Sequence, residues 1–174
     1  MTRAEVLKNA GIAAGLAGVY FASGKLGLQL AYVHASATAV WPCTGIAIAA
    51  LLVYGYRVWP GILVGAFFIN LTTAGTFGTS VVLAVGDTLE AVAACYLVTR
   101  FARGKEAFER ASDIFKFTML AGLAATAISA TVGVTTLAAS GFANWAAYGS
   151  IWLTWWLGDG VGAVIVAARG RAVP

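Results

Sequence analysis

Four charged side chains lie well inside apolar segments of this 174-residue chain, away from the segment ends, and they are the residues whose types could do chemistry: Lys25, Asp87, Glu90 and Asp159. Asp87 and Glu90 are three residues apart, so they share one face of a helix. An ionised side chain at the centre of a membrane-spanning helix costs about 2.5–3.5 kcal/mol unless it finds a partner or changes protonation. We therefore expect the three carboxyl groups to face one another inside a helix bundle, where they are paired, hydrogen-bonded or protonated.

The depth of each group suggests a division of roles. Counted along helices at about 1.5 Å per residue, Lys25 and Asp87 fall about seven residues from the outer ends of their spans, so an ion pair between them is geometrically reasonable. Gln29 continues the polar face of Lys25. Glu90 and Asp159 lie deeper, and because loss of water disfavours a charged carboxyl group, they are the better candidates for protonation changes. A purely structural polar network is the alternative.

Aromatic side chains close to these groups suggest a pocket. Trp155 or Trp156 falls on the same helical stripe as Asp159, and aromatic walls around a few polar groups are typical of small-molecule sites. Packing alone explains the stripe equally well. Asn70 could hydrogen-bond across helices, or simply fill its place in the bundle.

Two Trp-Pro pairs mark helix starts, Trp41-Pro42 and Trp59-Pro60. Proline at the first helical position loses no intrahelical hydrogen bond, and an indole can anchor a helix end among lipid headgroups. We expect the first pair, followed by Thr44, to begin a span at the outer surface and the second pair to begin one at the inner surface. Both tryptophans are also candidates for pocket residues.

The composition predicts the elements that must position these side chains. Hydrophobic residues make up 60% of the chain and charged residues 10%, against about 25% charged in soluble domains, and the mean hydropathy is +0.85. We predict an all-α integral membrane protein with a bundle of about six transmembrane helices, in the apolar segments 6–32, 44–56, 59–71, 80–98, 114–138 and 145–168. The second and third segments, about 13 residues each, are short for a span of about 20 and suggest a tight helical hairpin; a re-entrant pair is the alternative. Residues 1–24 could instead form a signal peptide.

The basic residues predict the orientation. Ten of the eleven fall in alternate connections: Arg3, Lys8, Arg57, Arg100, Arg103, Lys105, Arg110, Lys116, Arg169 and Arg171. The intervening loops, 36–40, 72–79 and 141–143, contain no Lys, Arg, Asp or Glu. Because Lys and Arg near span ends stay in the cytoplasm, both termini are expected there. The pI near 9.3 follows from this bias and gives no reason to invoke nucleic acid.

Small residues at helical spacing predict the packed faces of the helices, because close backbone approach drives helix association in lipid. Three sets stand out: Gly11, Gly15, Gly18 and Ala22; Gly61 and Gly65; and Thr118, Gly122, Ala125 and Ser129.

Enzyme chemistry has little support in the sequence. The single histidine, His34, is expected to be exposed in the first outer loop, and no Cys and His residues have metal-ligand spacing, so neither a metal nor a cofactor is expected. Cys43 and Cys95 should lie near opposite ends of their spans and remain free thiols. An intramembrane aspartyl protease would have Gly-x-Gly before an aspartate such as Asp159, but residues 156–158 are Trp-Leu-Gly.

Four segments together resemble the membrane-associated sensor family MASE1: Trp-Pro-Cys-Thr-Gly-Ile-Ala (41–47), Trp-Pro-Gly-Ile (59–62) with 65–67 and Asn70, Gly-Asp-Thr-Leu-Glu-Ala (86–91), and Trp-Trp-Leu-Gly-Asp (155–159) with Gly162. The resemblance implies a multi-span input module of bacterial histidine kinases or diguanylate cyclases, located in the inner membrane. Cys43 and Asp87 depart from the family pattern, which has proline and more often asparagine there. Family members also continue into further spans and an output domain, which we expect this single domain, 1–174, to lack.

The leading hypothesis is therefore a membrane sensor in which a small ligand or a protonation change at Lys25, Gln29, Asp87, Glu90 and Asp159 shifts helix packing. Its expected partners are the lipid bilayer, an unknown small ligand and a cytoplasmic output domain or protein; a homodimer is left open. The alternative is the substrate-binding membrane component of an energy-coupling-factor-type vitamin or metal transporter, with the glycines of residues 11–22 docking a partner. A structural or assembly protein of the membrane is the third reading.

Overall fold

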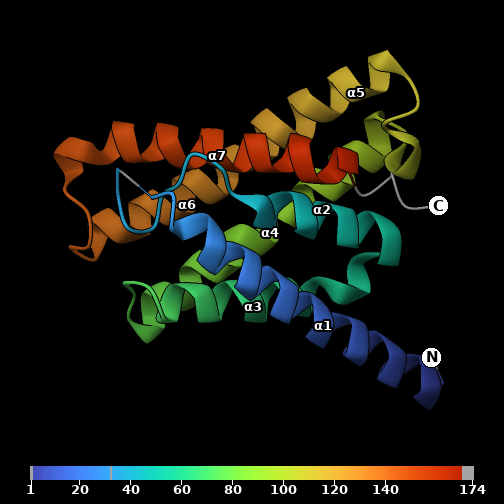
Figure 1. Cartoon of the computed structure of the whole chain (residues 1–174), viewed down its shortest axis with the longest axis horizontal. Helices are drawn as coiled ribbons and strands as arrows, with labels where there is room; N and C mark the ends of the chain where they lie inside the picture. Colours follow the sequence, from blue (N-terminus) through green and yellow to red (C-terminus); the bar gives the residue numbers. More distant parts are fainter. Residues whose placement is uncertain (1, 32, 170–174) are drawn as a thin grey trace.

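The computed structural model describes residues 2–31 and 33–169, so Tyr32, the expected end of the first span, and Arg171 lie outside it. No strand forms within these ranges, as expected for an all-α protein. The helices are α1 (Arg3–Leu28), α2 (Pro42–Tyr54), α3 (Trp59–Leu71), α4 (Phe77–Phe101), α5 (Ala111–Phe117), the π-helical segment η3 (Thr118–Ala125), α6 (Thr126–Ala139) and α7 (Tyr148–Arg169). Because α5, η3 and α6 follow one another without a break, six helical rods result (Figure 1).

Four of these rods are long and apolar enough to cross a membrane: α1, α4, the continuous rod Ala111–Ala139, and α7. The helices α2 and α3 have 13 residues each, which is about 20 Å against a hydrocarbon thickness of about 30 Å. The predicted all-α bundle is thus confirmed, with four helices long and apolar enough to span a membrane. For the hairpin of α2 and α3, full spanning stays a prediction.

Local sequence explains where the helices begin and end. Thr2 with Glu5, and Thr76 with Thr79, form capping boxes at the starts of α1 and α4, which satisfy backbone N–H groups that have no partner inside the helix. The helices α2 and α3 begin at Trp-Pro pairs, as predicted. Gly55, at φ 80°, ends α2 and allows the turn into α3, because glycine adopts this left-handed conformation without a steric penalty.

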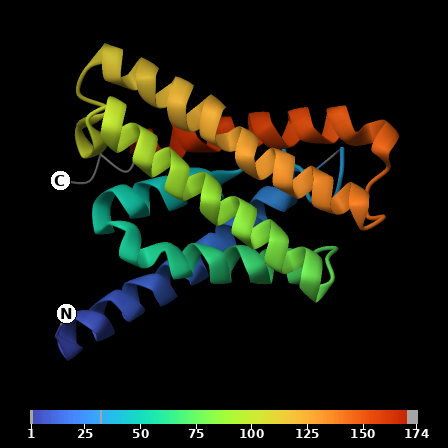
Figure 2. The ribbon, with the colours of Figure 1, turned by 180° about the vertical axis from the view of Figure 1, so that it is seen from behind.

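The rods form a closed ring of contacts. The helix α1 packs on α3, α3 on α4, α4 on α6, α6 on α7, and α7 on α2, which also contacts α4 and α1; Figure 2 shows α4 crossing the face opposite to α1 and α2. Gly61 and Gly65 allow α3 to approach α1, since a Cβ on Gly61 would overlap the Ala13 carbonyl and one on Gly65 would press on Tyr20.

The predicted packing face of α1 is wrong. Gly11, Gly15, Gly18 and Ala22 are exposed, and a Cβ at any of the three glycines would meet no atom within 4 Å. The helix packs instead through Leu16 and Tyr20, which are buried. Small residues permit close approach but do not attract a neighbour by themselves, and the larger apolar side chains on the other face bury more surface.

An irregular segment, residues 33–41, leads into α2. Ala37 and Thr38 within it are buried, and the Trp41 backbone N–H donates to the Gly158 carbonyl, in the middle of α7, at 2.9 Å. A Cβ on Gly158 would overlap Thr38 and one on Gly162 would overlap the Trp41 carbonyl, so glycine is required for this contact. Irregular backbone at membrane depth is tolerated where protein covers it.

The two ends of the bundle differ in charge. Arg3, the Gly55–Arg57 turn, the connection 102–110 and the last turn of α7 lie at one end, and the loops 33–40, 72–76 and 140–147 at the other (Figures 1 and 2). His34, at the second end, is half-buried rather than exposed. Its Nε2 lies 3.0 Å from the Phe142 carbonyl oxygen, so it links two loops of that end.

Candidate functional site

Four helices, α2, α4, α6 and α7, bring polar side chains to one buried point. Ser129 Oγ of α6 lies 3.0 Å from Asp87 Oδ1 of α4 and 3.3 Å from Asp159 Oδ2 of α7. The hydroxyl of Thr44, in the first turn of α2, donates to Asp159 Oδ1 at 3.1 Å. The Trp155 indole N–H donates to Ser129 Oγ at 3.1 Å. We call Thr44, Asp87, Glu90, Ser129 and Asp159 the carboxyl cluster.

Glu90 completes this cluster. Its side chain is 2% exposed, against 7% for Asp87 and 1% for Asp159. It lies close enough to Asp159 to interact electrostatically, while its Oε1 is buried without a hydrogen-bond partner among the described residues. The phenol of Tyr20, from α1, is close enough to interact electrostatically with all three carboxyl groups. Five helices, α1, α2, α4, α6 and α7, therefore contribute side chains around the three acids.

The cluster lies near the middle of the bundle. Asp87 is about ten residues from the start of α4, Ser129 about ten from the end of α6, and Asp159 about eleven from the start of α7, which puts each about 15 Å from the same end. The start of α2 is at this depth too, because Thr44 contacts Asp159. Trp41-Pro42 therefore begins its helix inside the bundle, and the prediction that this pair lies at the outer surface is wrong.

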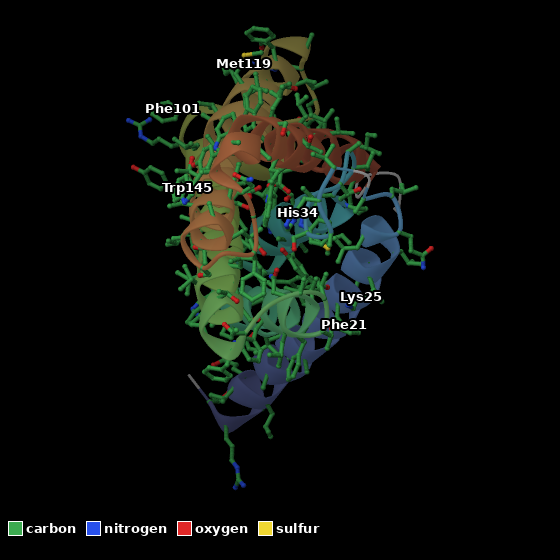
Figure 3. The ribbon with its side chains drawn as sticks, turned by 90° about the vertical axis from the view of Figure 1, so that its left-hand side faces the viewer. Phe21, Lys25, His34, Phe101, Met119 and Trp145 are labelled. Carbon is green, nitrogen blue, oxygen red and sulfur yellow. The ribbon has the colours of Figure 1, made fainter. Side chains whose placement is uncertain are left out.

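Lys25 is not part of the cluster. Its ammonium group donates to the Thr72 carbonyl at 2.9 Å and to Thr73 Oγ1 at 3.0 Å, beyond the last turn of α3, and Figure 3 shows it on α1 at the side of the molecule. The predicted ion pair with Asp87 does not form, because the free carbonyls at the end of α3 lie nearer to the ammonium group and are accessible to it. Gln29, which ends α1, is exposed and also lies apart.

The tryptophans predicted for a pocket divide into two groups. Trp155 is buried, packs on Gly133 and reaches the carboxyl cluster through Ser129. Trp156 instead donates to the Leu123 carbonyl at 2.8 Å and lines an apolar surface cavity of about 400 Å³ between η3 and α7. Of the two, only Trp155 lies next to the acids; a role for either in a ligand pocket stays a prediction.

Three further predicted residues stay outside the cluster. Trp59 is 44% exposed, beside Tyr56 on the surface of α3 and α4. Asn70 donates to the Ala66 carbonyl of its own helix at 2.9 Å, so of the two alternatives for this residue the structure favours the one without a bond across helices. Trp41 is half-buried, with its indole against Gly24 and Gly27 of α1.

The site therefore consists of acids without a base. Two ion pairs, Arg103 with Glu106 and Lys116 with Asp113, lie away from the cluster. Groups of His, Cys, Asp and Glu able to hold a metal ion are also absent from the described residues. At 1–7% exposure the carboxyl groups cannot touch an organic molecule without a rearrangement of the helices, whereas a proton needs no such space.

Sequence reasoning missed two residues of this site. Ser129 was expected only as a small residue on a packed face, and Tyr20 was not singled out. The spacing from Thr118 to Ser129 did place the serine on an inward face, and a hydroxyl there was the available signal. Cys43 is buried and free, as predicted, and so is Cys95; the Cys43 thiol donates to the Tyr20 carbonyl at 3.3 Å.

The model of one protein family, MASE1, matches residues 12–170, nearly the whole chain. MASE1 is a membrane-associated sensory domain and has a role in signal input rather than catalysis. Neither the curated proteins nor the solved structures hold a match. Because the family model matches nearly the whole chain, and the chain has the apolar helices of a membrane domain, this chain belongs to the MASE1 family of membrane sensor domains.

Proposed function

We propose that this chain is the sensory input module of a signalling protein in the bacterial inner membrane, and that the carboxyl cluster receives its signal. The signal is a small molecule or a change in protonation within the bilayer. A cytoplasmic output of the histidine kinase or diguanylate cyclase type reads it. The observation that supports this proposal most is the convergence of Asp87, Glu90 and Asp159, all buried and without a basic partner among the residues that the structure describes.

Such a cluster is expensive to maintain for structure alone. Three acids at about 3 kcal/mol each are a large load on a protein whose net stability is on the order of 5–15 kcal/mol. Apolar residues of similar volume would pack without this cost. Intramembrane acids turned toward the bundle interior are typical of functional sites.

The helices that meet at the cluster also reach the basic end of the bundle. The rod of α6, η3 and α5 extends from Ser129 to Ala111, and α7 extends from Asp159 to Arg169. If the hydrogen bonds among α4, α6 and α7 change, these rigid helices can therefore carry the movement to the basic end. The clustering of Lys and Arg there supports a cytoplasmic location for this end and for both termini.

The test uses a MASE1 signalling protein whose input domain is replaced by this chain, with kinase or cyclase output measured in membranes. Changing Glu90 to Gln and Asp159 to Asn should lock the output at one level and abolish its response to the pH of the medium. Glu106→Gln, which removes an exposed ion pair with Arg103, is the matched control and should respond normally. Normal signalling by the double variant at normal membrane levels would disprove the assignment.

The transporter reading is not favoured by any of these observations. The family match is to a sensory domain, and the glycines of α1 that would dock a transport partner have no feature beyond their exposure.

A further inference from the structure

Ser129 lies between more hydrogen-bonding partners than its single hydrogen can serve. Its oxygen is 3.1 Å from the Trp155 indole nitrogen, 3.0 Å from Asp87 Oδ1 and 3.3 Å from Asp159 Oδ2. An indole N–H can only donate, so it occupies one lone pair of Ser129. The serine hydrogen satisfies one aspartate. The contact with the other aspartate is a hydrogen bond only if that carboxyl group supplies the hydrogen.

The pair Glu90 and Asp159 gives a second reason to expect a bound proton. They lie close enough to interact electrostatically, and two carboxylates have acceptors only. A direct bond between them therefore also requires a proton, as in other carboxyl pairs that share a site. The Glu90 Oε1 atom, buried and without a partner among the described residues, is a further acceptor for it.

Among the described residues, the groups that face the cluster offer no other neutralising charge. The helix α1 contributes the Tyr20 phenol and α2 the Cys43 thiol. The acids themselves come from α4 and α7, while α3, η3 and α6 have no titratable residue in their sequences. Lys25 is bonded to Thr72 and Thr73.

We propose that Asp87, Glu90 and Asp159 hold at least one shared proton, with Ser129 as the bridge, and that the proton itself is the ligand of this site. This inference rests on the proposed function only for its signalling consequence. When the proton passes to water, two negatively charged aspartate oxygens face one serine hydrogen. Ser129 then keeps its bond to Asp87 or to Asp159 but not to both, and α6 separates from α7 or from α4.

Infrared difference spectroscopy of the purified chain in lipid bilayers tests this inference, through the C=O stretching band of protonated carboxyl groups and its shift in D2O. At neutral pH the wild-type chain should show this band, and alkaline buffer should remove it. Asp87→Asn should lower its intensity, because an amide supplies its own hydrogens to Ser129. Glu106→Gln should leave it unchanged.

Ser129 is tested separately in the same spectra. Ser129→Ala should shift the band by removing the bridge, and Ser129→Thr, which keeps the hydroxyl, should restore the wild-type position even if the alanine variant folds poorly. Absence of the band from a folded wild-type chain at neutral pH would overturn the shared proton, as would an intensity unaffected by Asp87→Asn. A present band with output unaffected by Glu90→Gln and Asp159→Asn would instead refute the proposed function and leave the shared proton standing.

Discussion

At the scale of single residues, the site depends on hydroxyl groups that link acids on different helices. Thr44 binds Asp159, and Ser129 lies between Asp87 and Asp159. A buried polar network of this kind stabilises only while its members are satisfied, because each unpaired group keeps its full desolvation cost.

Removing the central hydroxyl should therefore destabilise the protein. Ser129→Ala leaves the Trp155 N–H and an aspartate oxygen without their partner, and we expect the free energy of unfolding to fall by about 1–3 kcal/mol. Chemical denaturation in detergent, followed by circular dichroism, measures this change. Ser150→Ala, at an exposed serine bonded to the Ala147 carbonyl, should change stability by less than about 0.5 kcal/mol; equal effects of the two would contradict the network.

Lys25 provides a second test at this scale. Because its ammonium group bonds to Thr72 and Thr73, Lys25→Met should reduce the free energy of unfolding by about 0.5–1.5 kcal/mol and leave the infrared band of the acids unchanged. If Lys25 paired with Asp87 instead, its removal would alter that band.

The sequence predicted which acids meet inside the bundle but not all of their partners. Asp87 and Glu90 share a face through their spacing, and any acid within an apolar span must turn inward, so their meeting with Asp159 was predictable. The bond of Lys25 was not, because it is made to a backbone carbonyl at the end of α3, which no residue type marks. The hydrogen bond of Asn70 was not predictable either, because its side-chain amide bonds to a backbone carbonyl of its own helix and needs no partner on another helix.

At the scale of elements, the contact that most distinguishes this bundle is that of segment 33–41 with α7. It places the start of α2 beside Asp159 and depends on the absence of side chains at Gly158 and Gly162. Sequence periodicity identified the helices, because their apolar runs are long. It could not show that the chain before Pro42 enters the bundle, since an irregular segment has no periodic pattern and its apolar residues also suit an outer loop.

Adding a methyl group at this contact should be costly. Gly162→Ala would force a Cβ into the Trp41 carbonyl, and we expect the free energy of unfolding to fall by about 1–3 kcal/mol or more. Gly149→Ala, in the same helix with no atom within 4 Å of the new Cβ, should leave stability unchanged or raise it by up to about 1 kcal/mol. Thermal unfolding of the two variants measures this difference. Similar losses of stability in both would refute the close approach of Gly162 to the Trp41 carbonyl.

At the scale of the whole molecule, the alternating directions of the rods collect the basic residues at one end. Charge placement predicted this arrangement because each connection follows a helix that reverses the chain. What it could not predict is the tilt and exposure of α1, whose glycine face points away from the other helices.

Site-specific labelling tests the orientation. Cysteines placed at Arg103 and at Ala35, in connections at opposite ends of the bundle, should react with a membrane-impermeant thiol reagent from opposite sides. Arg103→Cys should label only in inverted vesicles and Ala35→Cys only in intact spheroplasts, while the buried Cys43 and Cys95 stay unlabelled. The reverse pattern would invert the proposed topology.

The most direct test of the account is whether the state of the buried acids sets the packing of the basic end. Spin labels can be attached at Arg57→Cys and Arg110→Cys, both exposed positions at that end. Pulsed electron paramagnetic resonance then measures the distance between the α2–α3 turn and the start of α5. Neutralising the acids with Glu90→Gln and Asp159→Asn should shift this distance by on the order of 1–2 Å or more relative to the alkaline wild-type chain, with no shift for Lys25→Met. Identical distance distributions in neutralised and alkaline wild-type samples would contradict it.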